Sequence, residues 1–224
     1  MTTTVTDHPS QEPAKRRKHS MSSIKTAVIG SGDIGRTLAT RFTQAGHTVT
    51  FGARDPRKQE LVDLAGRIGA RVTGIDDAID SSDVIVWAIN GAAMADAIPA
   101  HGSRLDGKTV VDATNNIGAV SLNSLDLVHR YAPSARLYRA FNSLGWENFA
   151  DPRFGDTTGD MLYSGPTGDS QQTVETLIEA TGLRPLRVGD NDKIKIVDDF
   201  VALWFTLAFE RGMGRDLGFK ILTR

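Results

Sequence analysis

The sequence contains no cysteine and few histidines. Without cysteine, the 224-residue chain has no disulfide, no thiolate zinc site, no iron–sulfur cluster and no cysteine nucleophile. The five histidines are scattered, and none pairs with another at metal-ligand spacing. We therefore expect no metal site, and the lack of cysteine is typical of a cytoplasmic protein.

An excess of charge of either sign and a long apolar run are also missing. The formal net charge is -1, which removes any overall electrostatic attraction to nucleic acid. The longest apolar stretch, FVALWFTLAF at 200–209, is about half as long as a membrane-crossing helix, so we expect no membrane association. The polar start of the chain has a basic cluster but no apolar run after it, which argues against a secretory signal. We interpret residues 1–22 as a disordered tail.

From Lys25 onward, short β-branched runs alternate with helix-like segments. Strands joined through helices pair in parallel with right-handed crossovers. The pattern predicts an α/β fold, a Rossmann-like doubly wound and mostly parallel sheet with a small C-terminal α/β and helical extension. The expected strands are KTAVIG (25–30), HTVTFG (47–52), RVTG (71–74), DVIVWAIN (83–90), KTVVDATN (108–115) and ARLYRAFN (135–142).

The segment GSGDIG matches the pattern G-x-G-x-x-G. It follows the first expected strand and opens a helix, which is the context that a dinucleotide-binding loop requires. Gly30 permits the tight turn, Gly32 lets the backbone approach a pyrophosphate, and Gly35 lets the helix pack on the strand. The Lys-Ser/Thr ending of a Walker loop is absent, so the pattern favours a dinucleotide.

The position about twenty residues beyond this loop indicates which dinucleotide binds. Sites for NAD usually carry Asp or Glu there, whereas this chain has Ala53 and Arg54. Ala53 leaves room for a phosphate, while Arg54 and Lys58 can bind it. Asp55 opposes this reading unless it caps a helix that starts at Pro56. We predict NADP(H) rather than NAD(H).

After Asn142 the sequence changes in character. A long loop is expected over 143–159, then a strand, a helix and a strand that extend the sheet. The end is expected to form a long helix, a glycine-containing break and a final short helix. The long helix is apolar on two faces, Trp204 lying on one of them, which favours a subunit contact and a homodimer. We divide the chain into an NADP-binding domain at 23–142 and an acceptor-side and dimerisation region at 143–224.

The motifs GSGDIG, GARDPRK, VVDATN, RAFNSLGWE and RGMGRDLGFKIL, in this order, resemble the F420-dependent NADP oxidoreductases. The resemblance extends from Lys25 to the C-terminus. It implies hydride transfer between NADPH and a ring acceptor, the deazaflavin coenzyme F420 as co-substrate. One departure concerns the acceptor pocket, where the family's proline-aromatic pair is replaced by Asn90-Gly91-Ala92-Ala93.

The resemblance also implies which residues bind the cofactor. Besides the three motif glycines, these are Ser31, Asp33 and Ile34 at the pyrophosphate, Ala53, Arg54 and Lys58 at the 2′-phosphate, Ala88, Ile89 and Asn90 at the riboses, Ala140 and Asn142 near the carboxamide, and Met213 closing over the site. Asn115 joins them as an orienting polar contact.

No catalytic residue is predicted. Hydride transfer to a deazaflavin needs alignment of two rings rather than a proton donor. Core or surface roles are favoured for the four residues that could otherwise be proposed as acids, Tyr138, Tyr163, His129 and Asp112. Two alternatives remain open: an NADPH-dependent reductase of a flavin, imine or carbonyl compound acting on a small molecule, and a non-catalytic NADPH-sensing module.

Overall fold

The computed structural model describes residues 23–224, so the predicted tail at 1–22 lies outside the described residues. Its centre is one eight-stranded sheet in the order β10-β9-β6-β5-β4-β1-β2-β3. The strands of this sheet are β1 (Lys25–Ile29), β2 (Thr48–Ala53), β3 (Arg71–Gly74), β4 (Val84–Trp87), β5 (Thr109–Asp112), β6 (Arg136–Arg139), β9 (Asp160–Ser164) and β10 (Arg184–Gly189).

Helices connect these strands. They are α1 (Asp33–Gln44), α2 (Gln59–Ile68), α3 (Ile75–Asp80), α4 (Met94–His101), α5 (Leu125–Tyr131), α6 (Glu147–Ala150), α7 (Asp169–Ala180) and α8 (Ile194–Phe205), with shorter turns η1 (Gly91–Ala93), η2 (Gly102–Leu105), η3 (Asn191–Lys193) and the π-helical η4 (Thr206–Glu210). Within residues 23–224, no helix combines the length and apolarity needed to cross a bilayer.

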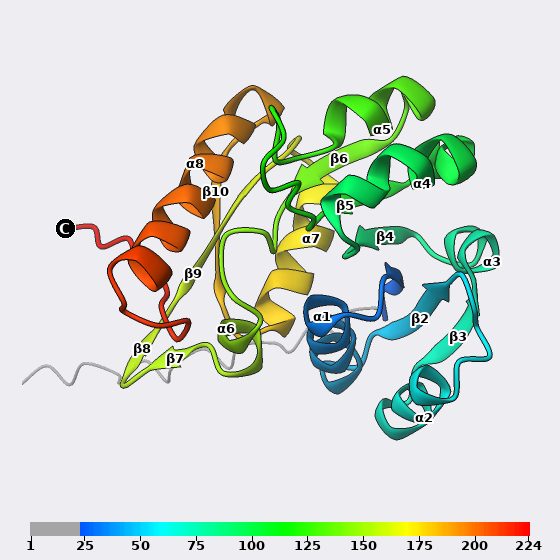
Figure 1. The fold of residues 1–224 in the computed structure, drawn as a ribbon, viewed down its shortest axis with the longest axis horizontal. Helices are drawn as coiled ribbons and strands as arrows, with labels where there is room; N and C mark the ends of the chain where they lie inside the picture. Colours follow the sequence, from blue (N-terminus) through cyan, green and yellow to red (C-terminus); the bar gives the residue numbers. More distant parts are fainter. Residues whose placement is uncertain (1–22) are drawn as a thin grey trace, which may run out of the picture.

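The sheet confirms the predicted Rossmann-like topology. Strands β1 to β6 pair in parallel, and the chain runs outward from β1 to β3 before it returns to β4 on the other side of β1. This reversal opens a crevice at the carboxyl ends of β1 and β4, where ligands of doubly wound sheets bind. In Figure 1, α2 and β3 lie at one end of the molecule, and α8 and the C-terminus lie at the other.

The predicted C-terminal strand–helix–strand unit is confirmed, but it enters the sheet in the opposite direction. Strand β9 pairs antiparallel with β6 through the single pair Arg139 and Ser164, and β10 then pairs parallel with β9. One sheet therefore runs through both regions that the sequence separates at residue 142.

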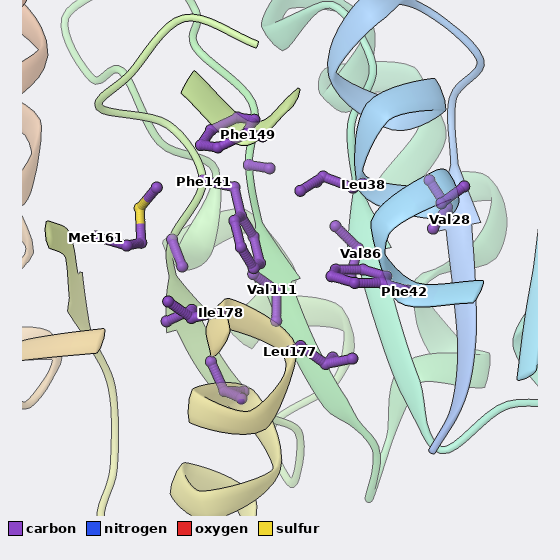
Figure 2. Close-up of a cluster of buried hydrophobic side chains, with 14 of the residues drawn as sticks. Val28, Leu38, Phe42, Val86, Val111, Phe141, Phe149, Met161, Leu177 and Ile178 are labelled. Carbon is purple, nitrogen blue, oxygen red and sulfur yellow. The ribbon is translucent and has the colours of Figure 1, made fainter. Parts of the chain in front are cut away.

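Two apolar layers cover the sheet. One joins α1, α2, α6 and α7 to the strands, and the other joins α3, α4 and α5 to the opposite side chains of the same strands. Figure 2 shows the first layer, where Phe42 from α1 and Leu177 from α7 approach Val86 and Val111 of the central strands. The edge of Phe141 also meets the ring of Phe149, with centroids 6.0 Å apart. Because these two layers bury both faces of the sheet, its central strands are continuous apolar runs in the sequence.

Three local expectations are wrong. Helix α2 begins at Gln59 rather than at Pro56, because the Asp55 carboxylate accepts the Arg57 amide at 3.1 Å and closes a turn of its own. The expected loop over 143–159 contains α6 and a small hairpin, β7 (Arg153–Phe154) with β8 (Thr157–Thr158). The final short helix does not form, and residues 211–224 are irregular.

The long helix packs differently from the subunit contact that its pattern favours. Its face with Val197, Val201, Trp204 and Ala208 is buried inside this same chain. The adjoining side chains of Leu203, Phe205 and Phe209 remain exposed, by 44%, 37% and 51%. Trp204 is therefore a core residue, and only the adjoining face is free for a partner.

The C-terminal segment is held by a buried carboxylate on β9. Asp160 accepts two hydrogen bonds from Arg184 at 2.7 Å each, one from the Ile221 amide at 2.7 Å and one from Lys220 at 3.1 Å. Burial alone would raise the pKa of the Asp160 carboxyl, but the bonds from Arg184, Ile221 and Lys220 outweigh it and hold the pKa below its usual value.

We expect Asp160→Asn to lower the free energy of unfolding by about 1–3 kcal/mol at neutral pH, because hydrogen bonds to a charged group are lost. A lowered folded-state pKa stabilises the protein above the unfolded pKa of about 3.9, and this contribution disappears as the pH falls through the folded value. Urea unfolding at several pH values should show the difference between wild type and variant shrinking in acid. Asp156→Asn, at an exposed position nearby, is the matched control; an equal loss there would contradict the assignment.

Candidate cofactor site

The loop between β1 and α1 leaves no room for larger residues at two of its glycines. Gly30 has a φ of +119°, and a Cβ atom there would lie 2.3 Å from the Ala88 carbonyl oxygen. A Cβ atom at Gly35 would lie 2.2 Å from the Gly30 carbonyl oxygen, so the first turn of α1 packs directly on the end of β1. A Cβ atom at Gly32 would meet no protein atom within 4 Å. The open backbone at Gly32 and the free amides of α1 form a cradle that fits a pyrophosphate.

An arginine outside the glycine motif braces this loop. Arg36 donates from Nε to the Ser31 carbonyl oxygen at 2.6 Å, and its guanidinium also pairs with Glu60 of α2. Arg36 is not among the residues predicted from the sequence, although a basic residue directly after the last motif glycine is a usable signal. Its side chain fixes the loop against α2.

Two cations lie at the carboxyl end of β2. Arg54 follows Ala53, the last residue of the strand; it is exposed and makes no ion pair with any residue from 23 to 224. Lys58 precedes α2, and its Nζ lies 3.3 Å from the Glu60 carboxylate. Hydrogen bonds from Arg36 and Lys58 lower the pKa of the Glu60 carboxyl, which therefore stays charged. Among residues 23–224, Arg54 is therefore the cation without an ion-pair partner at this end of the site.

The glycine loop and these cations share one cavity of about 960 Å³, a volume typical of ligand sites. The cavity brings together nine of the predicted cofactor residues: Gly30, Ser31, Gly32, Ala53, Arg54, Lys58, Ala88, Ile89 and Asn90. Three more, Asp33, Ile34 and Gly35, form the first turn of α1 directly behind the loop.

One wall of the cavity was missed by the sequence analysis. Ala93, Ala97 and Ala100 of η1 and α4 line it, together with Ile75 and His101. The alanines recur at the spacing of one helix face, a signal that the segment GAAMADAIPA carries. Their small side chains leave an apolar slot between α3 and α4.

The other predicted residues do not line this cavity. Ala140 and Asn142 are buried beyond the end of β6, and Asn115 donates from its amide to the Asn142 carbonyl oxygen at 2.9 Å. Met213 is 59% exposed on the segment after η4, and its amide donates to the Leu207 carbonyl oxygen at 3.1 Å.

A buried charged network surrounds Asn115 and Asn142. Arg139, the last residue of β6, is fully buried; its Nε donates to the Asp198 carboxylate of α8 at 2.8 Å, and its Nη1 lies 3.4 Å from the Asp112 carboxylate. Its Nη2 donates to the Asn115 side chain at 2.8 Å. With its amide oxygen turned to the guanidinium, Asn142 accepts from Nε and Nη2 at 3.2 Å each.

The tyrosines and Asp112 have the core roles favoured for them. The Tyr138 hydroxyl bonds to the Ser170 side chain at 2.7 Å, and the Tyr163 hydroxyl donates to Glu175. Burial, then the bond to Glu175, raises the pKa of Tyr163, so its hydroxyl keeps its proton. Among residues 23–224, no three or more histidine or acidic side chains converge in a group fit for a metal ion.

Comparison with known proteins agrees with this geometry. Residues 25–116 match the family model described as NADP oxidoreductase coenzyme F420-dependent. The F420-dependent NADP reductase of Methanothermobacter thermautotrophicus is 28% identical over 224 aligned residues, with 88% of this chain and 94% of that protein covered. A crystal structure from Arthrobacter sp. FB24, described as a candidate F420-dependent NADP reductase, superposes with a TM-score of 0.78 at 23% identity, covering 90% of this chain and all of that one.

A longer relative is the metalloreductase STEAP3 of Rattus norvegicus, which is 29% identical over 172 residues. The match covers 74% of this chain but 34% of the metalloreductase, so the chain spans about a third of that relative. The family match begins at the first residue of β1 and includes the glycine loop, the Arg54 corner and the alanine-lined wall. Residues 25–116 therefore carry the NADP oxidoreductase domain of the coenzyme F420-dependent family, and the chain is similar to an F420-dependent NADP reductase over 88% of its length.

Proposed function

We propose that the chain transfers a hydride between NADPH and coenzyme F420. The observation that supports NADPH as the donor is that the open Gly32 backbone and Arg54, which pairs with no acidic side chain in residues 23–224, line one cavity. The acceptor is supported by the match to the F420-dependent NADP reductase, which extends over 94% of that protein. NADP(H), when bound, supplies the hydride-carrying ring.

The residues proposed to hold the cofactor act by position and charge. The α1 amides and the Gly32 backbone would bind the pyrophosphate, and Arg54 with Lys58 would bind the 2′-phosphate. Ala88, Ile89 and Asn90 would lie along the riboses, while Ala140, Asn142, Asn115 and Met213 would belong to the nicotinamide side. Hydride transfer between two aligned rings requires no proton donor, which suits a site whose tyrosines are engaged elsewhere.

We also propose that the chain acts in the cytoplasm as a homodimer. The feature that supports a dimer is the exposed face formed by Leu203, Phe205 and Phe209, because large apolar side chains grouped on a surface commonly mark a contact. Residues 143–224 would then supply both the acceptor side and the subunit contact.

The purified chain should oxidise NADPH when coenzyme F420 is supplied, followed as loss of the absorbance of the oxidised deazaflavin. The expected result is saturable turnover with NADPH and much slower turnover with NADH. Flavin mononucleotide, a cyclic imine and a ketone serve as parallel acceptors. Turnover with one of these and none with the deazaflavin would contradict the proposed acceptor, and saturable NADPH binding without turnover would favour a sensing module.

A further inference from the structure

The buried Arg139 carries more contacts than its place in the sheet requires. Its side chain is fully buried and faces two carboxylates, Asp112 and Asp198. A buried ion pair adds little net stability compared with apolar residues of the same size, because both charges lose their water. We therefore look for the role of Arg139 in where it holds the groups that it binds, rather than in the stability that it adds.

Those groups lie on the segment that leaves the carboxyl end of β5. Nη1 of Arg139 donates to the carbonyl oxygens of Asp112, at 3.1 Å, and of Thr114, while Nη2 binds the Asn115 side chain. The Asp112 carboxylate in turn accepts the Thr114 amide at 2.9 Å and the Ser124 amide at 2.7 Å. The network thus fixes both ends of the loop that follows β5.

A strained residue completes the arrangement. Phe141 has a φ of +62°, the one positive value at a non-glycine position in residues 23–224. Such a backbone costs about 1–3 kcal/mol and persists where its surroundings impose it, often beside a functional site. The turn at Phe141 brings the Asn142 carbonyl oxygen to the Asn115 side chain, so the segments after β5 and β6 are tied together.

The segment that follows β5 packs against the wall of the cofactor cavity at Gly91. A Cβ atom at Gly91 would lie 2.4 Å from the Asn116 amide nitrogen and 2.5 Å from the Asn115 carbonyl carbon. Gly91 follows Asn90, which lines the cavity. In a doubly wound sheet the adenosine half of the dinucleotide lies over β2, and the other half extends across β4 toward β5. The wall that Arg139 supports is therefore on the nicotinamide side.

We propose that Arg139 and Asp198 are positioning residues that hold segment Thr114–Asn116 against the nicotinamide half of the cavity. Asp198 lies on α8 and also accepts from the Asn123 side chain at 2.8 Å, so the C-terminal helix fixes the donor site across the sheet. This inference rests on the proposed NADPH function, but not on the identity of the acceptor. The inference predicts different effects at the two ends of the cavity. The network sets the placement of the nicotinamide and leaves the adenosine end unaffected.

Asp198→Asn tests this because it removes the charge and keeps the shape. With NADPH and coenzyme F420 we expect kcat to fall by about 10- to 100-fold, since a small misplacement of reacting groups has an effect of this size. The KM for NADPH should change little. The matched control is Asp199→Asn, the next residue on α8, which is exposed and paired with Lys195 at 2.6 Å; it should behave like wild type.

Two binding measurements keep the test independent of the acceptor. The fluorescence of bound NADPH reports the surroundings of the nicotinamide, and Asp198→Asn should shift its emission. The affinity for 2′,5′-ADP, which lacks the nicotinamide half, should stay unchanged. An unshifted emission, or an equal loss of affinity for 2′,5′-ADP and NADPH, would overturn the proposal. Failure of the wild type to reduce the deazaflavin would refute the proposed function alone.

A milder variant covers the case in which Asp198→Asn does not fold. Asn123→Ala removes the hydrogen bond to Asp198 and the one that the Asn123 side chain accepts from the Leu125 amide at 3.1 Å, and it leaves the buried ion pair in place. It should shift the emission of bound NADPH in the same direction by a smaller amount, with unchanged affinity for 2′,5′-ADP. An emission identical to wild type would overturn the proposal here too.

Discussion

Arg54→Glu should raise the Kd for NADPH by about 100- to 1000-fold while the Kd for NADH stays the same or falls. The wild-type guanidinium is exposed in the cofactor cavity and has no ion-pair partner in the described part of the chain, which suits it to bind a phosphate. Hydrogen bonds to charged groups contribute about 1.5–3 kcal/mol, and each 1.4 kcal/mol is about a tenfold change. The introduced carboxylate adds repulsion of the 2′-phosphate, which NADH lacks. Titration calorimetry with both cofactors measures the effect.

The chain supplies a matched control for this reversal of charge. Arg57→Glu makes the same change three residues away, at a side chain that is 94% exposed and does not line the cavity. It should alter NADPH binding only slightly, and mainly at low salt, because exposed charges are screened. A loss of the same size with both cofactors in Arg54→Glu would show that Arg54 supports the fold of the corner rather than the phosphate.

Trp204→Ala should lower the free energy of unfolding by about 3–5 kcal/mol, the usual range for a large buried aromatic residue. Trp204 is 3% exposed, and its Nε1 donates to the Leu217 carbonyl oxygen at 2.7 Å. The Arg215 guanidinium lies 5.5 Å from its ring centroid. The substitution therefore removes packing, a hydrogen bond and a cation–π contact together. Chemical denaturation gives the magnitude.

A variant at the neighbouring residue Leu203 distinguishes an effect on folding from an effect on dimer formation. Leu203→Glu changes an exposed side chain on the same turn of α8, so it should leave the unfolding free energy nearly unchanged. If the exposed face forms a homodimer, this variant should sediment as a monomer where wild type sediments as a dimer. A small stability loss in Trp204→Ala, comparable to that in Leu203→Glu, would contradict the core role of Trp204.

The parts of the site that the sequence predicts are those built from local rules. A glycine with positive φ, a helix that starts after a strand, and a cation in place of an acid all lie within residues 30–54. The alanine wall of α4 is also encoded locally, because the spacing of Ala93, Ala97 and Ala100 in the sequence places them on one helix face. It was not among the predictions. Local patterns are informative here because short strand–loop–helix units, β1 with α1, β2 with α2 and β4 with α4, supply nearly all of the residues that line the donor cavity.

Two of the missed features depend on contacts between distant residues. Arg139 and Asp198 are separated by 59 positions, and no spacing rule joins them. Helix α8 would show the same two apolar faces whether this chain's own core or a partner subunit buried them. Its sequence pattern therefore cannot distinguish the two cases. The turn closed by Asp55 competes with a helix start at Pro56, and a single hydrogen bond decides between them.

The antiparallel junction between β6 and β9 has an evolutionary consequence. A single residue pair joins the first six strands to the last two in this sheet, so the backbone contacts that a recombination event would have to preserve there are few. An exchange of chain between residues 140 and 160 would keep the lining of the dinucleotide cavity complete and replace the region proposed to face the acceptor. The incoming segment would need a strand that runs against β6, a carboxylate able to meet Arg139, and apolar side chains that replace those of α6 and α7 in the shared core layer.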